Sequence, residues 1–309
     1  MPSLRQLRSR LRSLNGTKQI MRAMQLVSAS KLKRAQGRLM QARDVLGFLD
    51  GLLARVLAQA ESKRQRSPRA SGLTLDHPLC AAQEGPNALV LFTSDAGLCG
   101  SYNTTLIQLA ESYLRRDSSR TTQLIHIGKK GYRYFTKRGY AAAESYLDLA
   151  GRPDLSKAGA IGRALMARFL DGRSASVHLA YSAFVSSAVY RPTVLQWLPI
   201  QIGGTGPPGG ALPRASGASP HPPALDYIFE PSPERIFEDL LPRWALARFQ
   251  LVMLEAFTSE HSARMIAMKN ATDNAEELLK ALTLLRNKIR QATITKELSE
   301  IVGTAEALR

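Results

Sequence analysis

The stretch that decides the fold runs from Trp244 to Arg309, WALARFQLVMLEAFTSEHSARMIAMKNATDNAEELLKALTLLRNKIRQATITKELSEIVGTAEALR. It contains no proline and a single glycine, Gly303, so nothing in it forces a helix to end before its last turns. Apolar or small side chains recur along it at steps of three and four, at Leu246, Phe249, Met253, Ala256, Ala263, Ala267, Ala271, Ala275, Leu278, Leu282, Leu285, Ile289 and Ala292. The pattern predicts one helix with one apolar seam. At about 1.5 Å per residue this helix would be roughly 95 Å long, so it needs an equally long partner.

The start of the chain supplies a second helix of similar length. Steps of three and four alternate without a break along Leu4, Leu7, Leu11, Leu14, Lys18, Met21, Gln25, Ser28, Leu32, Ala35, Leu39, Ala42, Leu46, Leu49, Leu53 and Val56. A seven-residue repeat sustained over this length is typical of a left-handed coiled coil. We therefore expect the N-terminal and C-terminal helices to pair.

Three polar residues interrupt the apolar seam of the first helix, namely Lys18, Gln25 and Ser28. One interpretation is that they fix the register of the pair, or that Asn15-Gly16 loosens the helix locally. The other is that the seam opens here because something else surrounds the two helices. The sequence leaves both interpretations open.

Positive charge is concentrated on the first helix. The chain of 309 residues has a formal charge of +17, and residues 1–66 contain 15 Lys or Arg against 3 acids, whereas residues 233–309 contain 11 of each. The charges circle the helix, so an acidic ring of partners around it is one explanation. A nucleic-acid partner is disfavoured because aromatic residues make up 6% of the chain and do not interleave with the basic ones.

The first 43 residues contain no acid and resemble an organelle transit peptide in composition. The repeat continues unbroken through them into the rest of the chain, which argues against a cleaved leader. No apolar run approaches the ~20 residues of a membrane span. Cys80 and Cys99 form neither a disulfide framework nor a zinc pattern, which favours a reducing compartment.

The middle of the chain changes period. Residues 61–84 are rich in Ser, Pro, Arg and Gly and indicate a linker. Over residues 85–200, short apolar runs at 88–94, 123–128, 176–184 and 193–200 alternate with helical patterns at 104–116, 129–138 and 155–170. This alternation predicts a Rossmann-like α/β domain with a mostly parallel sheet.

The loop Ser94 to Ser101, SDAGLCGS, follows the first predicted strand, where related folds hold a phosphate. It does not have the GxGxxG spacing, so a tight turn is favoured over a nucleotide site. Cys99 could be a nucleophile by position, but His126 and His178 lie inside apolar runs and look like strand residues. We expect no catalytic residue, no metal and no cofactor.

Residues 201–228 contain the Pro/Gly-rich run GGTGPPGGALPRASGASPHPP, to which we assign no structure. After it, Ser232 is placed to cap a helix, with Pro233 at the first helical position and Glu234 in the first turn. Pro242 is expected to kink or restart this helix. The predicted helical pair thus comprises residues 1–60 and 233–309.

Three separated blocks resemble one family, the gamma subunit of the F-type ATP synthase. The blocks are IMRAMQLVSASKL at residues 20–32, GLCG at 97–100, and SEHSARMIAMK with ATDNA at 259–275, completed by RQATITKELSEIV at 290–302. They occur in the family's order and cover both termini and the middle of the chain. The resemblance implies an antiparallel coiled coil that acts as a rotor shaft, without catalysis of its own.

The resemblance also implies partners and a location. The shaft would pierce a ring of three alpha and three beta subunits, and its α/β domain would bind epsilon and the c-ring, so membrane contact would come through the complex. Catalysis would belong to the beta subunits. The protein would be peripheral on the cytoplasmic face of the bacterial inner (plasma) membrane, with an organellar location less favoured.

Transfer of the family's motif positions gives a set of expected partner contacts. Met24 would be an apolar contact near the lever segment of the beta subunit, and Arg22, Lys31 and Lys33 would lie near acidic groups of that subunit. Catch-like polar contacts with beta would involve Arg264, Arg290, Gln291 and Thr295. The chain departs from the family pattern at Ala96 before GLCG, at Ser101-Tyr102-Asn103 after it, and at Ile289 in the seam. An enzyme on the α/β domain is the competing interpretation.

Overall fold

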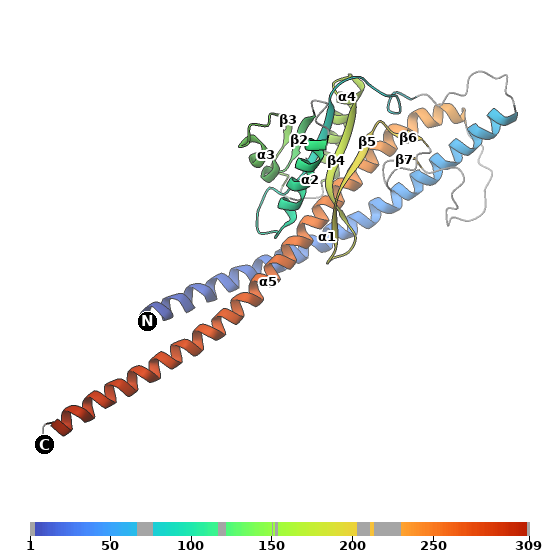
Figure 1. Cartoon of the computed structure of the whole chain (residues 1–309). Coiled ribbons are helices and arrows are strands. Elements are labelled where there is room, and N and C mark those ends of the chain that lie inside the picture. Colours follow the sequence, from blue (N-terminus) through green and yellow to red (C-terminus); the bar gives the residue numbers. More distant parts are fainter. Residues whose placement is uncertain are drawn as a thin grey trace. The chain divides into compact units, whose positions relative to one another are not determined.

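The computed structural model describes residues 4–66, 77–116, 122–149, 151, 154–202, 211–212 and 230–307. The chain divides into two compact units. One comprises Met1–Ser30 with Arg264–Arg309, and the other comprises Lys31–Ala263. Both long helices, α1 (Leu4–Arg66) and α5 (Pro233–Ala307), run through both units (Figure 1).

The larger unit is built on a five-stranded sheet. Its strands are β1 (Asn87–Phe92), β2 (Gln123–Ile127), β3 (Ala142–Tyr146), β4 (Ser176–Phe184) and β5 (Tyr190–Leu198). Their order is β3-β2-β1-β4-β5, and every neighbouring pair is parallel except β4 and β5. The predicted α/β class with a mostly parallel sheet is confirmed.

Helices cover both faces of this sheet, and we call the sheet and these helices the sheet domain. The helices are α2 (Tyr102–Arg116), α3 (Lys129–Thr136) and α4 (Leu155–Leu170). Leu89 and Leu91 of β1 pack with α2 and α3, whereas Val90 and Phe92 pack with α4, α1 and α5. Because successive strand residues face opposite sides, the continuous apolar run of β1 fits a strand that is buried on both faces.

Helix α5 begins as predicted, but it does not restart at Pro242. Ser232 caps it, since its Oγ accepts a hydrogen bond from Arg235 N at 3.3 Å. The helix continues through Pro242 to Ala307, so of the two expected effects, a kink or a restart, the restart does not occur. Leu241 and Trp244 are buried on either side of the proline, and this packing offsets the one hydrogen bond that proline cannot donate.

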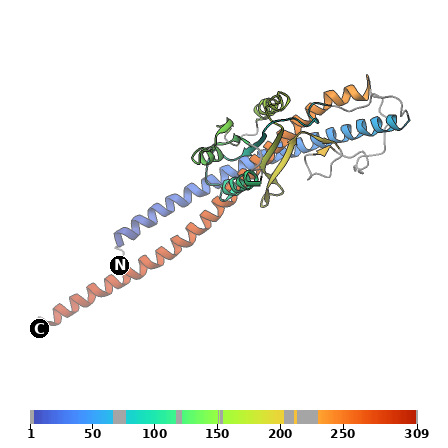
Figure 2. The same ribbon diagram turned by 45° about the horizontal axis from the view of Figure 1, so that its top comes forward.

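In the smaller unit the two helices are antiparallel, because the first residues of α1 and the last of α5 lie at the same end (Figures 1 and 2). All the repeat positions from Leu4 to Ser28 are at least half-buried. Lys18 Nζ lies 3.5 Å from Glu276 Oε2 across the pair, and Ser28 is buried. Helix α1 continues through Asn15-Gly16 without a break.

Several boundaries differ from those expected. Helix α1 ends at Arg66, beyond residue 60, and β3 was not predicted. β6 (Gln201–Ile202) and β7 (Ala211–Leu212) form a short parallel pair within residues 201–228, which we expected to be a flexible Pro/Gly-rich loop. The rest of that stretch, 203–210 and 213–229, and linker residues 67–76 lie outside the described residues.

Candidate partner-contact surfaces

The expected contacts of α1 in the smaller unit lie on a partly apolar surface. Arg22 is exposed and Met24 is half-buried. Around them Ile20, Leu26 and Val27 are each more than half exposed. Apolar side chains with that exposure are candidates for contact with another protein, because they remain in water when the unit stands alone. The structure therefore places Met24 and Arg22 on a surface that a partner could cover.

The outer part of α5 presents three of the expected polar contacts to solvent. Arg290, Gln291 and Thr295 are all exposed. Exposed apolar residues share this end of the helix, namely Ile294, Leu298, Ile301 and Val302. Arg264 differs from these residues, because it is buried and lies about 39 Å further back along the helix. The structure therefore does not bring Arg264 together with Arg290.

In the larger unit, Lys31 and Lys33 line a cavity of about 700 Å³. Its other lining residues are Arg34, Gly37, Arg38 and Gln41 of α1, Gly151 before α4, and His261 of α5. We call this cavity the basic groove. The sequence analysis did not single out Arg34 and Arg38, although the run of basic residues from 31 to 38 was the available signal.

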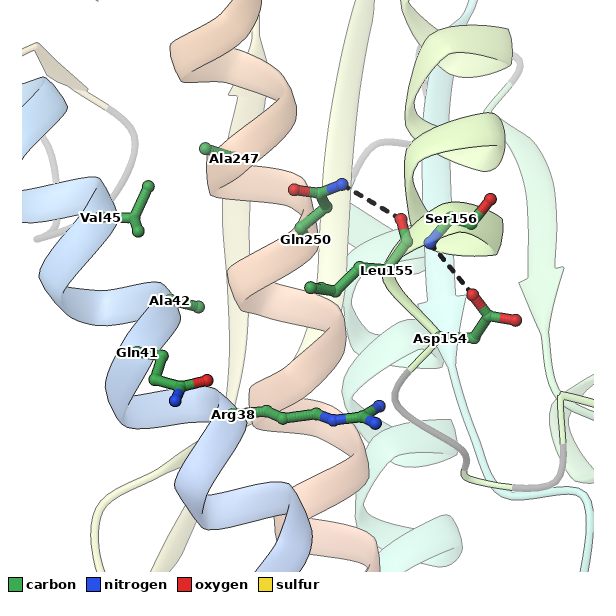
Figure 3. A pocket seen from close by; sticks show the side chains of 9 residues that line it. All are labelled: Arg38, Gln41, Ala42, Val45, Asp154, Leu155, Ser156, Ala247 and Gln250. Carbon is green, nitrogen blue, oxygen red and sulfur yellow. Dashed lines mark hydrogen bonds between the residues drawn. The ribbon is translucent and has the colours of Figure 1, made fainter.

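A second cavity, of about 860 Å³, shares Arg38 and Gln41 with the basic groove (Figure 3). It lies between α1, α5 and the start of α4, and Val45 of α1 also lines it. Asp154 caps α4 by accepting hydrogen bonds from Ser156 N at 3.0 Å and Lys157 N at 3.3 Å. This cavity therefore has both polar and apolar side chains on its α1 side and a carboxylate at its α4 side.

The loop after β1 is filled by its own side chains. Ser94 N donates to Asn103 Oδ1 at 2.9 Å, and Asn103 Nδ2 donates to Cys99 Sγ at 3.1 Å. Asp95 Oδ1 accepts from Lys129 N at 3.1 Å, which adds a carboxylate where a phosphate would sit. These contacts favour the tight-turn interpretation over a nucleotide site. Within the described ranges, no group of three or more His, Cys, Asp or Glu could hold a metal ion.

The polar segment Thr258–Ser262 of α5 was not predicted to be buried, although the sequence analysis quoted Ser259–Ser262 in a family motif. Its residues are buried, and three of them bond to main-chain carbonyls of the sheet domain. The available signal was five consecutive polar residues, TSEHS, inside an otherwise apolar repeat. In the part of the chain that the structure describes, no helix has the length and hydropathy needed to cross a membrane.

Comparisons with known proteins agree with this architecture. The family model described as ATP synthase matches residues 3–308. The ATP synthase gamma chain of Symbiobacterium thermophilum is 40% identical over 97% of this chain and 96% of its own length. That of Anaeromyxobacter dehalogenans strain 2CP-C is 38% identical over 100% of both.

Solved structures share the fold. One chain of the central stalk and c-ring structure of the Tetrahymena thermophila mitochondrial ATP synthase is 22% identical, with a TM-score of 0.54 over 82% of this chain and 99% of that one. One chain of the Euglena gracilis mitochondrial enzyme is 18% identical, with a TM-score of 0.52 over 91% and 95% of the two chains. With a family match across both long helices and the sheet domain, the chain belongs to the ATP synthase gamma-chain family.

Proposed function

We propose that this chain is the central rotor shaft of a rotary ATP synthase and couples ion-driven rotation to ATP synthesis and hydrolysis. The observation that carries the proposal is the extent of the family match, which includes both long helices and the sheet domain between them. Coupling by a shaft requires no chemistry of its own. It requires that the shaft make different contacts with each conformation of the subunits it faces.

The catalytic sites in this proposal belong to the beta subunits. The loop after β1 supports this assignment, because Asn103 already occupies the Ser94 main-chain N–H that a phosphate would need. Cys99 is buried beneath the same side chain. An enzyme on the sheet domain would need a reactive group that is open to substrate at this edge of the sheet.

The proposed partners are the ring of alpha and beta subunits, the epsilon subunit and the c-ring. The Tetrahymena structure is described as a central stalk with a c-ring, and the Euglena structure as an assembly of OSCP, F1 and c-ring. By analogy, this chain joins such an assembly at the cytoplasmic face of the bacterial plasma membrane. The bacterial origin of its relatives supports that location.

The expected contact residues keep their roles within this proposal. Met24 and the exposed side chains of the outer part of α5 would meet the apolar and polar surfaces of the ring. Lys31 and Lys33, in the basic groove, would face acidic segments of beta. Such charge complementarity guides docking and sets register more than it adds affinity.

Reconstitution with alpha and beta subunits tests the proposed function. We expect the complete mixture to form a stable complex that hydrolyses ATP and rotates a probe attached to the sheet domain. The matched control omits this chain. If the alpha and beta subunits alone assemble equally well and hydrolyse ATP at the same rate, the chain is not the shaft. ATP hydrolysis by the isolated chain would also contradict the proposal.

A further inference from the structure

We propose that torque passes between the sheet domain and the shaft through α5 rather than α1, because the sheet domain holds α5 from two sides at Thr258–Ser262. We call these five residues the grip segment. The inference rests on the proposed function, because it concerns how torque passes between the sheet domain and the helices. It adds which helix carries the torque and which side chains hold it.

The first observation is the burial of the grip segment. All five side chains are polar, and their residues are at most 4% exposed. Five consecutive residues of a helix point in every direction around its axis, at about 100° per residue. Helix α5 is therefore enclosed on all sides at this turn, although the apolar seam alone would need only one side covered.

The second observation is a set of directional bonds to the sheet domain. Ser259 Oγ donates to the carbonyl of Ser182 in β4 at 2.9 Å, and Ser262 Oγ donates to the carbonyl of Ser187 in the turn before β5. His261 Nε2 lies 2.8 Å from the carbonyl of Gly151. Since a carbonyl oxygen can only accept, Nε2 must carry the hydrogen.

These bonds hold the helix from different directions. At about 100° per residue, Ser259 and Ser262 point within about 60° of each other, toward the β4–β5 hairpin, and His261 points about 130° away from their mean direction. Bonds on opposing sides of a rod resist its rotation about its own axis. The grip segment can therefore pass torque in either direction of rotation.

Further bonds set the position of α5 along its axis. Trp197 Nε1 donates to the carbonyl of Ala245 at 3.0 Å, and the Tyr102 hydroxyl donates to the carbonyl of Ala256 at 3.0 Å. Gln250 Nε2 donates to the carbonyl of Leu155 at 3.2 Å (Figure 3). The sheet domain thus holds α5 by hydrogen bonds from Ala245 to Ser262, about 25 Å of helix.

Helix α1 is held differently within the same unit: the hydrogen bond to the sheet domain from Arg43 Nη2 to the carbonyl of Phe184, at 3.0 Å, comes from a side chain that is 39% exposed. Its residues Arg38 and Gln41 line both cavities, so this face of α1 borders open space instead of packed side chains. Its seam residues Leu39, Leu46 and Leu53 pack in the apolar core. Apolar packing is non-directional, whereas a hydrogen bond weakens steeply when its geometry changes. We infer that α1 rotates with α5 and that α5 is the helix that carries the torque.

The test compares two double variants in the complete, reconstituted synthase. Ser259→Ala/Ser262→Ala removes two hydroxyls that bond α5 to the sheet domain. Thr104→Ala/Ser112→Ala removes two hydroxyls from the exposed face of α2 and is the matched control. Single-molecule rotation measures the torsional stiffness of the rotor, and ion pumping per ATP measures coupling.

We expect the Ser259/Ser262 variant to lose at least twofold in torsional stiffness and in ions pumped per ATP, with ATP hydrolysis within twofold of the parent. The control should match the parent in all three measurements. His261→Leu against His261→Gln gives an independent pair, because glutamine keeps a donor and leucine does not. We expect the leucine variant to lower the torsional stiffness of the rotor and the glutamine variant to retain at least half of the parental stiffness.

The inference is overturned if neither the Ser259/Ser262 nor the His261→Leu variant changes stiffness or coupling. Arg43→Met removes the hydrogen bonds from α1 to Glu255 of α5 and to the carbonyl of Phe184. The inference is also overturned if this variant lowers the torsional stiffness more than the Ser259/Ser262 and His261→Leu variants do. These results are distinct from failure of the proposed function. If the proposed function is wrong, the parent chain itself will fail to support rotation.

Discussion

Arg43 of α1 and Glu255 of α5 form an ion pair, with Arg43 Nη2 donating to Glu255 Oε1 at 2.8 Å. The Glu255 side chain is 12% exposed and that of Arg43 is 39% exposed, so the carboxylate has little access to water. Tyr181 also hydrogen-bonds to Glu255, and burial followed by the charge of Glu255 raises the pKa of Tyr181 well above its usual value. The tyrosine therefore stays neutral and remains a donor.

Arg43→Ala is expected to lower the free energy of unfolding by about 1–2 kcal/mol, because it leaves a nearly buried carboxylate with one fewer partner. The remaining bond from Tyr181 limits the loss. Urea unfolding of the purified chain measures it. Arg12→Ala, at an exposed position of α1, is the control and should change stability by less than about 0.5 kcal/mol. Equal effects of the two substitutions would show that the ion pair adds no stability.

Two glycines of α4 give a matched pair of substitutions. A Cβ atom at Gly162 would lie 2.8 Å from Leu246 Cδ1 and 3.0 Å from Phe249 Cδ1, both in the packed core with α5. At Gly159 the nearest atom would be Gln250 Nε2, at 3.3 Å, on a flexible side chain. Alanine favours a helix over glycine by about 1 kcal/mol at either site. The two positions differ in whether the neighbour can move.

Gly162→Ala is expected to cost about 1–3 kcal/mol of unfolding free energy, because overpacking exceeds the gain in helix propensity. Gly159→Ala should be neutral or stabilising by up to about 1 kcal/mol, since the flexible Gln250 side chain needs to shift by only a few tenths of an ångström and can keep its hydrogen bond to Leu155. Thermal and urea unfolding of both variants check this order. If Gly162→Ala is as stable as Gly159→Ala, α4 and α5 are not in close contact at Gly162.

The sequence predicts the helices and central strands because their apolar residues repeat at the required periods. It misses β3 because Ala142 to Tyr146 alternates half-buried with exposed residues at the sheet edge and has no continuous apolar run. Edge strands of this kind give a weak signal. Of the kink or restart expected at Pro242, the restart does not occur, because the neighbouring side chains Leu241 and Trp244 are buried and a local rule does not include such packing.

The contact surfaces were predictable in part. The basic run that contains Lys31 and Lys33 was visible from charge alone, but the groove also requires Gly151 and His261, which are distant in sequence. The hydrogen bonds of the grip segment could not be predicted, because their acceptors are main-chain carbonyls, which every residue has. Burial of Arg264 also depends on packing that the motif does not encode.

Gln291→Ala should separate a partner contact from a role in folding. The residue is exposed near the end of α5, so the substitution is expected to change the stability of the isolated chain by less than about 0.5 kcal/mol. In the reconstituted complex we expect lower ATP hydrolysis, because the proposed polar contact with beta is lost. Lys296→Ala, which removes an exposed i,i+4 ion pair with Glu300, is the control. Parental ATP hydrolysis by the Gln291→Ala complex would exclude this contact.

His126 of β2 is fully buried, with its ring centroid 5.7 Å from that of Phe135 and 5.9 Å from that of Tyr132. Within the described residues, neither ring nitrogen has a hydrogen-bond partner. Burial lowers the pKa of His126 to about 4 from an ordinary value of 6.5. The ring is therefore neutral in the folded chain at pH 5, whereas in the unfolded chain it would bind a proton.

Because the unfolded state binds more protons between pH 6.5 and 4, stability should be greatest above pH 6.5 and fall as the pH drops through this window. His126 is expected to lower the free energy of unfolding at pH 5 by up to about 2 kcal/mol relative to pH 7.5. His126→Leu should remove that part of the pH dependence, and it should stabilise the chain at pH 7.5 because two unpaired buried nitrogens are gone. Urea unfolding of parent and variant at both pH values measures the difference. If the variant loses as much stability as the parent between pH 7.5 and 5, other groups control the acid sensitivity of the chain.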